Sequence, residues 1–197
     1  MSSESIKNTI SLMVITLIAG LLLGVVYEIT KEPIAAEQQR AKEEAYKAVF
    51  ADAQSFEAIK LDVVNVESKL ADNGYDATVN EAMKVLDKDG NAAGYVLTVT
   101  DHEGYGGDIQ FAMGVKLDGT VNGISFLSIS ETAGLGMKAA EEDFMKQFAN
   151  KNVESFQYTK NGASADGEVD AISGATITTN AVVNGVNAGL YYISTLE

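Results

Sequence analysis

The chain has 197 residues and no cysteine, which excludes thiolate iron–sulfur ligation, c-type haem attachment, disulfide bonds and a cysteine nucleophile. Its 14 Lys and Arg stand against 28 Asp and Glu, and the resulting formal net charge of −14 argues against nucleic-acid binding, which needs clustered basic side chains. A single histidine, His102, excludes a multi-histidine zinc site, while a hydrophobic content of 46% is typical of a folded protein.

An uncharged apolar segment lies near the N-terminus, between Lys7 and Glu28. As a helix, its 20 residues would extend roughly 30 Å, the thickness of a bilayer core. A cleaved signal peptide has a shorter apolar core and ends at a small-residue cleavage site, which residues 27–30 do not supply. The sequence therefore predicts a single uncleaved transmembrane helix within residues 1–30, in contact with membrane lipid.

Residues 31–60 are predicted to form a helical stalk, because residues 33–50 are mostly polar and rich in alanine. The Lys and Arg of this segment, taken by the positive-inside rule, would place the following domain in the cytoplasm. They are interleaved with acidic residues, so this indication of sidedness is weak. Residues 61–197 have the length of one domain.

Two pairs of β-type segments follow, each joined by an Asp-Gly turn. The first pair, 83–86 and 94–100, flanks Asp89-Gly90, and the second pair, 109–117 and 120–129, flanks Asp118-Gly119. Asp-Gly between β-type segments predicts a hairpin, because Gly accepts the positive φ of the turn. The two pairs share the pattern Asp-Gly-x-x-x-Gly, which indicates either an internal duplication or two hairpins that use the same turn chemistry. Because the shared pattern is short, the second interpretation is favoured.

Two helices are predicted near the C-terminus. Residues 137–150 repeat an apolar residue every four positions, at Ala140, Phe144 and Phe148. Residues 180–196 have a longer apolar stripe formed by Val182, Val186, Leu190 and Ile193. The soluble part is therefore expected to be α+β, an antiparallel sheet with helices packed on it.

The segment 170–180, with the sequence DAISGATITTN, leads small and hydroxyl residues directly into the last helix. Thr178, Thr179 or Asn180 would cap that helix. The segment is then either an ordinary capped loop, or a site where the free N–H groups of the helix start bind a phosphate or another anion.

Two further segments are rich in glycine. In residues 128–137, a strand ends and a tight loop begins. This segment is either a plain strand-to-helix connection with Glu131 solvated, or a place where backbone N–H groups and Leu135 form a flat, half-apolar cleft for a planar ligand. In residues 104–109, three glycines indicate a bend or a close backbone approach. A serine hydrolase is not favoured, because His102 is the one possible base.

Together these segments resemble the FMN-binding domain family, and most closely the G subunit of the Rnf complex. Residues 170–176, DAISGAT, look like the flavinylation motif D-x-x-[ST]-G-A-T, and residues 131–136, ETAGLG, look like the family's E-T-P-G-L-G with Ala133 in place of proline. The pattern Gly104-Tyr105-x-Gly107-x-Ile109 and the N-terminal anchor complete the order of the family's features.

The resemblance implies that Thr176 carries FMN covalently, through a phosphoester on its hydroxyl. A separate flavin transferase with FAD as donor would install it, with Asp170, Ser173, Gly174 and Ala175 as the recognition sequence. The other cofactor-binding residues implied by the resemblance are Glu131, Thr132, Gly134, Leu135 and Gly136. No residue of the chain is assigned a catalytic or metal-binding role.

The implied function is electron relay within the Rnf complex, which couples electron transfer between reduced ferredoxin and NAD to ion movement, with the other Rnf subunits as partners. The FMN domain would lie outside the cytoplasmic membrane and the N-terminus inside, contrary to the charge count. The alternatives are the C subunit of the sodium-translocating NADH:quinone oxidoreductase, a stand-alone extracytoplasmic flavoprotein, and a non-redox anchored binding or assembly module whose residues 173–176 only cap a helix.

Overall fold

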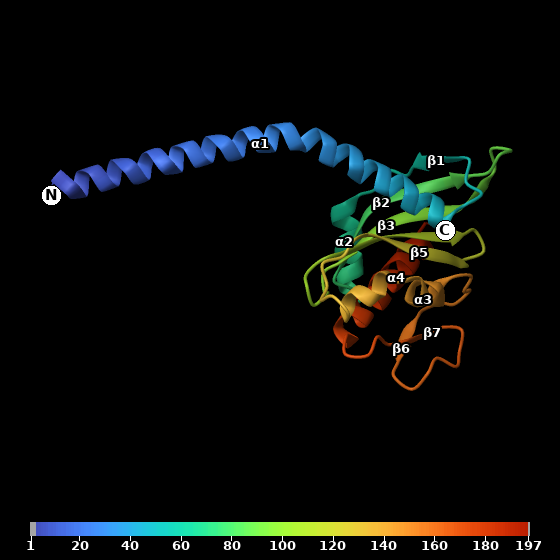
Figure 1. Cartoon of the computed structure of the whole chain (residues 1–197). Coiled ribbons are helices and arrows are strands. Elements are labelled where there is room, and N and C mark those ends of the chain that lie inside the picture. The colour runs from blue at the N-terminus through green and yellow to red at the C-terminus, as the bar shows by residue number, and fades with distance from the viewer. Residues whose placement is uncertain (1–2, 197) are drawn as a thin grey trace. The chain divides into compact units, whose positions relative to one another are not determined.

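The computed structural model describes residues 3–196 (Figure 1). The chain divides into two compact units, with the division between Ala41 and Lys42. The first unit is helical throughout its described residues, and the second unit contains all of the strands.

The helix α1, Ser3–Val49, contains the predicted membrane anchor. Its apolar window has a mean hydropathy of 2.5 and no buried residue, so it is long and apolar enough to cross a bilayer. The sequence predicted a second helix starting near Pro33, whereas α1 runs through this proline without a break. Proline removes one backbone hydrogen bond, and here that loss does not end the helix.

The second unit is built on a five-stranded antiparallel sheet whose strands follow the chain order. These strands are β1 (Ser55–Ala58), β2 (Ala77–Leu86), β3 (Ala92–Asp101), β4 (Ile109–Lys116) and β5 (Val121–Ser128). Strand β1 lies in the range predicted as helical stalk; α1 ends at Val49, and β1 pairs with β2. The short helix α2, Val63–Asp72, connects these two strands.

Both predicted hairpins are confirmed, as β2–β3 and β4–β5. In their turns, Gly90 has a φ of 79° and Gly119 a φ of 82°, the left-handed backbone that an Asp-Gly turn requires. The α+β fold class is also confirmed, because helices pack on both faces of this sheet.

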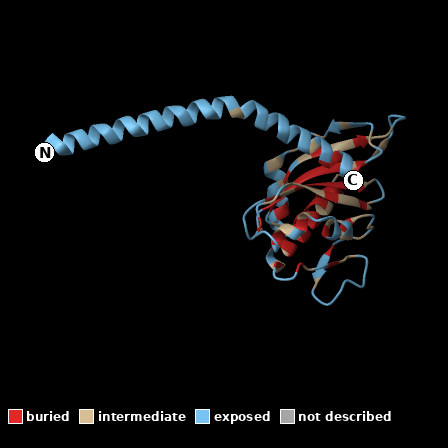
Figure 2. Ribbon diagram, viewed as in Figure 1, coloured by how far each residue is buried: buried red, intermediate tan, exposed pale blue. Residues whose placement is uncertain are grey.

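The two faces of the sheet have separate cores. Figure 2 shows that the buried residues lie mainly in the strands of the sheet and in α4. The last helix, α4 (Thr176–Ser194), covers the face that carries the alternate β3 residues Leu97 and Val99. The opposite face, which carries Val96, is covered by the C-terminal end of α1 and the residues just after it: Ala45, Tyr46, Val49 and Phe50. The sheet thereby holds α4 against strands β2, β3 and β4.

The continuous helix predicted for residues 137–150 is wrong. The segment forms a 3-10 helix at Gly136–Ala140, the single turn α3 at Glu142–Met145, and a further 3-10 turn at Lys146–Phe148. The break occurs at Glu141, whose extended backbone has a ψ of 147°. The predicted apolar face is real, since Phe144 and Phe148 are buried with ring centroids 5.7 Å apart. A short parallel pair, β6 (Gln157–Thr159) and β7 (Glu168–Asp170), then leads to α4.

Candidate functional site

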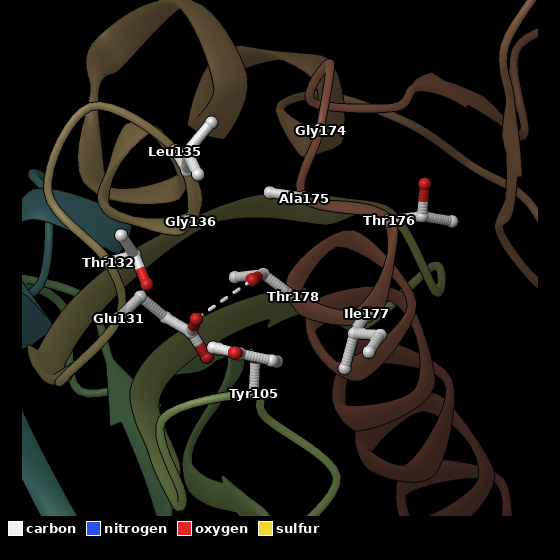
Figure 3. Close-up of a pocket in the computed structure, with 10 residues that line it drawn as sticks. All are labelled: Tyr105, Glu131, Thr132, Leu135, Gly136, Gly174, Ala175, Thr176, Ile177 and Thr178. Carbon is white, nitrogen blue, oxygen red and sulfur yellow. Dashed lines mark hydrogen bonds between the residues drawn. The ribbon is translucent and has the colours of Figure 1, made fainter.

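A cavity of about 540 Å³ lies where three loop segments meet beside the start of α4 (Figure 3). One segment follows β3, a second follows β5, and the third leads into α4. The residues that line the cavity are Tyr105, Glu131, Thr132, Leu135, Gly136, Gly174, Ala175, Thr176, Ile177 and Thr178. Each of the three segments singled out in the sequence thus contributes to one site.

The helix α4 begins at Thr176, four residues before the predicted start. Its N-cap is Ala175, which makes no side-chain capping hydrogen bond, so the prediction that Thr178, Thr179 or Asn180 caps the helix is wrong. The Thr179 hydroxyl instead accepts from the Ile172 N–H and donates to the Ala175 carbonyl, both at 3.0 Å. The first N–H groups of α4 consequently lack a side-chain cap at the cavity wall.

Glu131 is buried, with 8% of its surface exposed, so the interpretation of a solvated side chain is wrong. Its Oε1 accepts a hydrogen bond from the Gly106 N–H at 3.1 Å, and its Oε2 accepts from the Thr178 hydroxyl at 3.0 Å. Figure 3 shows the Glu131 side chain reaching across to Thr178. One carboxylate therefore links the segment after β5 to the other two segments of the cavity.

Two glycines allow the close packing of these segments. A Cβ on Gly106 would lie 2.1 Å from the Ser130 carbonyl oxygen, as the predicted close backbone approach requires. A Cβ on Gly136 would lie 2.6 Å from both the Glu131 Oε2 and the Thr178 Oγ1. Neither position has room for a side chain, so the close packing of the three cavity segments requires glycine at both.

The structure brings together seven of the ten predicted site residues: Glu131, Thr132, Leu135, Gly136, Gly174, Ala175 and Thr176. Gly134, Ser173 and Asp170 are exposed and do not line the cavity. Asp170 instead orders its surroundings, because its carboxylate accepts from the Ala163 N–H at 2.6 Å and its N–H donates to the Gln147 side chain at 2.6 Å.

Three lining residues were not predicted as site residues: Tyr105, Ile177 and Thr178. Tyr105 is 71% exposed and Ile177 is 54% exposed, although both are large and apolar. The sequence does carry a signal for these two positions: Tyr105 stands between glycines, and Ile177 is an apolar residue on the first turn of a helix. Thr178 has no such signal, because its role depends on a carboxylate 47 residues away.

The donor set suits a phosphorylated planar ligand better than a metal ion. Within residues 3–196, no group of His, Cys, Asp and Glu has an arrangement that would hold a metal. The cavity offers uncapped N–H groups at the start of α4 and apolar side chains at its rim, such as Leu135 and Ile177. Its volume lies within the usual range for cofactor pockets, and these features fit the phosphate and the ring of FMN.

Comparison with known proteins identifies two regions of the chain. Residues 104–191 match the family model described as FMN-binding domain, and residues 1–49 match the N-terminal region of the Rnf G subunit. The chain thus contains an FMN-binding domain that follows an N-terminal membrane-anchor region.

Relatives extend over nearly the whole chain. The G subunit of the ion-translocating oxidoreductase complex of Methanosarcina acetivorans is 33% identical over 100% of this chain and 98% of its own length. The G subunit of the Na(+)-translocating ferredoxin:NAD(+) oxidoreductase complex of Acetobacterium woodii is 29% identical over 97% of this chain and 92% of its own. The chain therefore belongs to the family of G subunits of ion-translocating oxidoreductase complexes, the Rnf complexes.

A solved structure with the same fold comes from a related system. The C subunit of the Na(+)-translocating NADH-quinone reductase from Parabacteroides distasonis has a TM-score of 0.51 and 22% identity, over 72% of this chain and 76% of that chain. This likeness supports the fold, while the relatives over the full length support the G-subunit assignment. The chain is thus a flavoprotein subunit of an Rnf complex, with an electron-transfer role and the other Rnf subunits as partners.

Proposed function

We propose that this subunit carries FMN covalently, as a phosphoester on the hydroxyl of Thr176. The observation that supports it is the position of Thr176 as the first residue of α4, at the cavity wall, after an N-cap that supplies no side-chain acceptor. A phosphate on this hydroxyl lies beside N–H groups that lack intrahelical partners and at the positive end of the helix dipole. The site therefore stabilises the phosphate that the bond would place there.

The bond is formed by a separate flavin transferase that uses FAD. The Thr176 hydroxyl oxygen attacks the phosphorus on the riboflavin side of FAD, its proton is released, and the bond to the AMP part breaks. FMN is left esterified to threonine, and AMP leaves. Asp170, Ser173 and Gly174 are exposed next to Thr176, where a transferase can reach them as its recognition sequence.

The remaining lining residues hold the ring. When bound, FMN supplies the chemistry of accepting and donating electrons, and the protein supplies its position and surroundings. Tyr105, Leu135 and Ile177 offer apolar surface from three different segments, and Thr132 and Gly136 complete the wall between them. No general acid or base is needed for such a relay, so the chain has no complete active site of its own.

The relay acts between other subunits of the complex. Relatives of this chain are named as subunits of ferredoxin:NAD(+) oxidoreductase complexes that translocate Na⁺ or protons. We infer that this chain receives electrons from one cofactor of its complex and passes them to another, without binding ferredoxin or NAD itself. A covalent bond keeps the cofactor on the protein during this exchange.

The inferred topology has the N-terminus in the cytoplasm, a lipid-embedded anchor within residues 1–30, and the FMN domain on the extracytoplasmic side. The apolar part of α1 supports the anchor. A dissociable flavin would be lost by dilution outside the cell, and this is the reason for a covalent bond on that side. The FMN domain is proposed to comprise residues 61–197, which lie within the compact unit that begins at Lys42.

The test is to express the full chain with and without a flavin transferase and to examine it on a denaturing gel under ultraviolet light. We expect a fluorescent band only with the transferase, and an intact mass raised by one FMN less one water. Peptide mapping should place the added mass on Thr176. Thr176→Ala should lose the fluorescence completely.

Thr195→Ala serves as the matched control, because it removes a threonine hydroxyl at the other end of α4. It should keep full fluorescence. A dark wild-type band from cells that contain an active transferase would overturn the proposal and favour the non-redox binding module. Retained covalent flavin in the Thr176→Ala variant would overturn the assignment of the residue.

A further inference from the structure

The cavity contains one acidic side chain with no cationic partner. Glu131 is 8% exposed, and none of the ion pairs found within residues 3–196 includes it. Its two oxygens are held by neutral donors, the Gly106 N–H and the Thr178 hydroxyl. A carboxylate removed from water without a counter-ion creates a strong local field, because the surrounding dielectric constant is low.

The same carboxylate joins the three segments that form the cavity. Glu131 follows β5, Gly106 lies in the loop after β3, and Thr178 lies in the first turn of α4. The backbones at Gly106 and Ser130 touch so closely that a Cβ at Gly106 would clash. A change at Glu131 therefore acts on all the walls of the cavity at once.

The charge of Glu131 also acts on whatever the cavity holds. Reduction adds electrons to a flavin ring, so a fixed negative charge close to the ring disfavours the reduced form. The nearest compensating feature is the positive end of α4, and the phosphate on Thr176 would share that same helix end. That phosphate adds a second negative charge at the helix end, so the partial positive charge of the dipole faces two anionic groups and does not cancel the charge of the carboxylate.

We propose that Glu131 is a positioning residue for the flavin and lowers its reduction potential: its carboxylate clamps the three cavity segments and places an uncompensated negative charge beside the ring. This inference rests on the proposed binding of FMN in the cavity. It assigns to Glu131 a function that its place in a loop motif does not specify.

The test compares two variants with opposite expected effects on the midpoint potential of the bound flavin. In Glu131→Gln, the amide oxygen can accept from the Gly106 N–H and the amide nitrogen can donate to the Thr178 hydroxyl. The clamp is thus kept while the charge is removed, and we expect the midpoint potential to rise. In Thr178→Val, the charge is kept but one of its two donors is lost, and we expect the midpoint potential to fall.

The potentials are measured by spectroelectrochemical titration of the flavinylated full chain. Glu57→Gln is the charge control, because Glu57 is an exposed carboxylate on the edge strand β1, and it should leave the potential unchanged. Unfolding of each unflavinylated variant is measured in parallel, and Glu131→Gln should lose little stability.

Opposite shifts in the two variants support the proposal. Shifts of both variants in the same direction would show that the two substitutions merely loosen the cavity, and this would overturn the proposal. An unchanged potential in Glu131→Gln would also overturn the proposal. If Glu131→Gln takes up no flavin, Thr178→Val decides alone, and an unchanged or raised potential overturns the proposal. A wild-type chain without covalent flavin contradicts the proposed function instead, and is recognised before any titration.

Discussion

The cavity and the core beneath α4 each bury a carboxyl group, and the two groups differ in their hydrogen-bond donors. Both oxygens of Glu131 in the cavity accept hydrogen bonds. Asp101, at the end of β3, is 0% exposed and accepts one bond from the Glu103 N–H at 2.9 Å. Its Oδ2 has no partner within the described part of the chain. Depth of burial alone therefore does not distinguish these two carboxyl groups, but the donors around them do.

The consequence for Asp101 is a large pKa shift. Burial raises the pKa of its carboxyl to about 7; the nearby acidic groups of Glu103 and Asp76 add to the rise, while the Glu103 N–H and His102 oppose it. Between the ordinary value of 3.8 and about 7, the folded protein holds a proton that the unfolded chain has released. The free energy of unfolding contributed by Asp101 thus falls as the pH rises through this range, and is level above it.

Asp101→Asn tests this side of the comparison and has the largest expected effect. The variant cannot titrate, so the stability difference, wild type minus variant, should fall by up to about 4 kcal/mol between pH 4 and pH 8, because each pKa unit corresponds to about 1.4 kcal/mol. Urea denaturation of both proteins across that range measures it. A difference that stays constant with pH would show that Asp101 is solvated in solution.

Gly136→Ala tests the cavity side. Its Cβ would lie 2.6 Å from the Glu131 Oε2 and the Thr178 Oγ1, so the hydrogen bond between these two atoms must be displaced. Overpacking of this kind costs about 1–3 kcal/mol, and we expect a lower stability together with a reduced yield of flavinylated protein. Both are measured, by urea denaturation and by the ratio of flavin to protein absorbance.

Gly119→Ala is the control for this substitution, because its Cβ would face open space and its φ of 82° adds backbone strain alone. It should lose about 1 kcal/mol of stability and no flavin. If Gly136→Ala retains full flavin and wild-type stability, the Glu131 and Thr178 side chains can move aside at little cost, and the hydrogen bonds of Glu131 do not hold the cavity segments rigidly.

The sequence predicted those parts of the fold that depend on neighbouring residues. The Asp-Gly turns predicted both hairpins, because the turn and its flanking strands lie within a short stretch of chain. The apolar stripe of α4 predicted its buried face, with Val182 and Val186 fully buried. The start of α4 was missed because the threonines that resemble caps make other hydrogen bonds, of which the one from Thr178 to Glu131 spans 47 residues.

The site shows the same limit. The motifs at residues 131–136 and 170–176 placed most of the lining residues, since each motif is local. The burial of Glu131 was open from the sequence, because its donors lie 25 and 47 residues away and are brought to it by the sheet and α4. The break at Glu141 was missed for a related reason: the spacing of Phe144 and Phe148 reports a buried face and not the backbone between them.

A third carboxyl group, Glu81, lies on the opposite face of the sheet and sharpens the comparison. Burial raises the pKa of this half-buried side chain, but hydrogen bonds from the Tyr46 hydroxyl and Lys42, at 2.6 and 2.9 Å, hold it below its usual value. Its contribution to stability is therefore present above the ordinary pKa of 4.5 and is lost as the pH falls below it. Glu81 has the cation that Glu131 lacks.

Tyr46→Phe has the smallest expected effect. It removes the hydroxyl that bonds to Glu81 and to Thr98, and should cost about 1–2 kcal/mol at neutral pH. The cost should shrink at acid pH, where Glu81 is protonated in both proteins. Tyr95→Phe is the control, because no hydrogen bond of the Tyr95 hydroxyl is found within residues 3–196. Thermal unfolding at pH 7 and at an acid pH well below 4.5, where the lowered pKa of Glu81 is also passed, compares the two variants. Equal costs at both pH values would mean that the hydroxyl stabilises the fold through Thr98 and not through the Glu81 carboxylate. The ion pair with Lys42 would then be the one contact that distinguishes Glu81 from the buried carboxyl groups of Glu131 and Asp101.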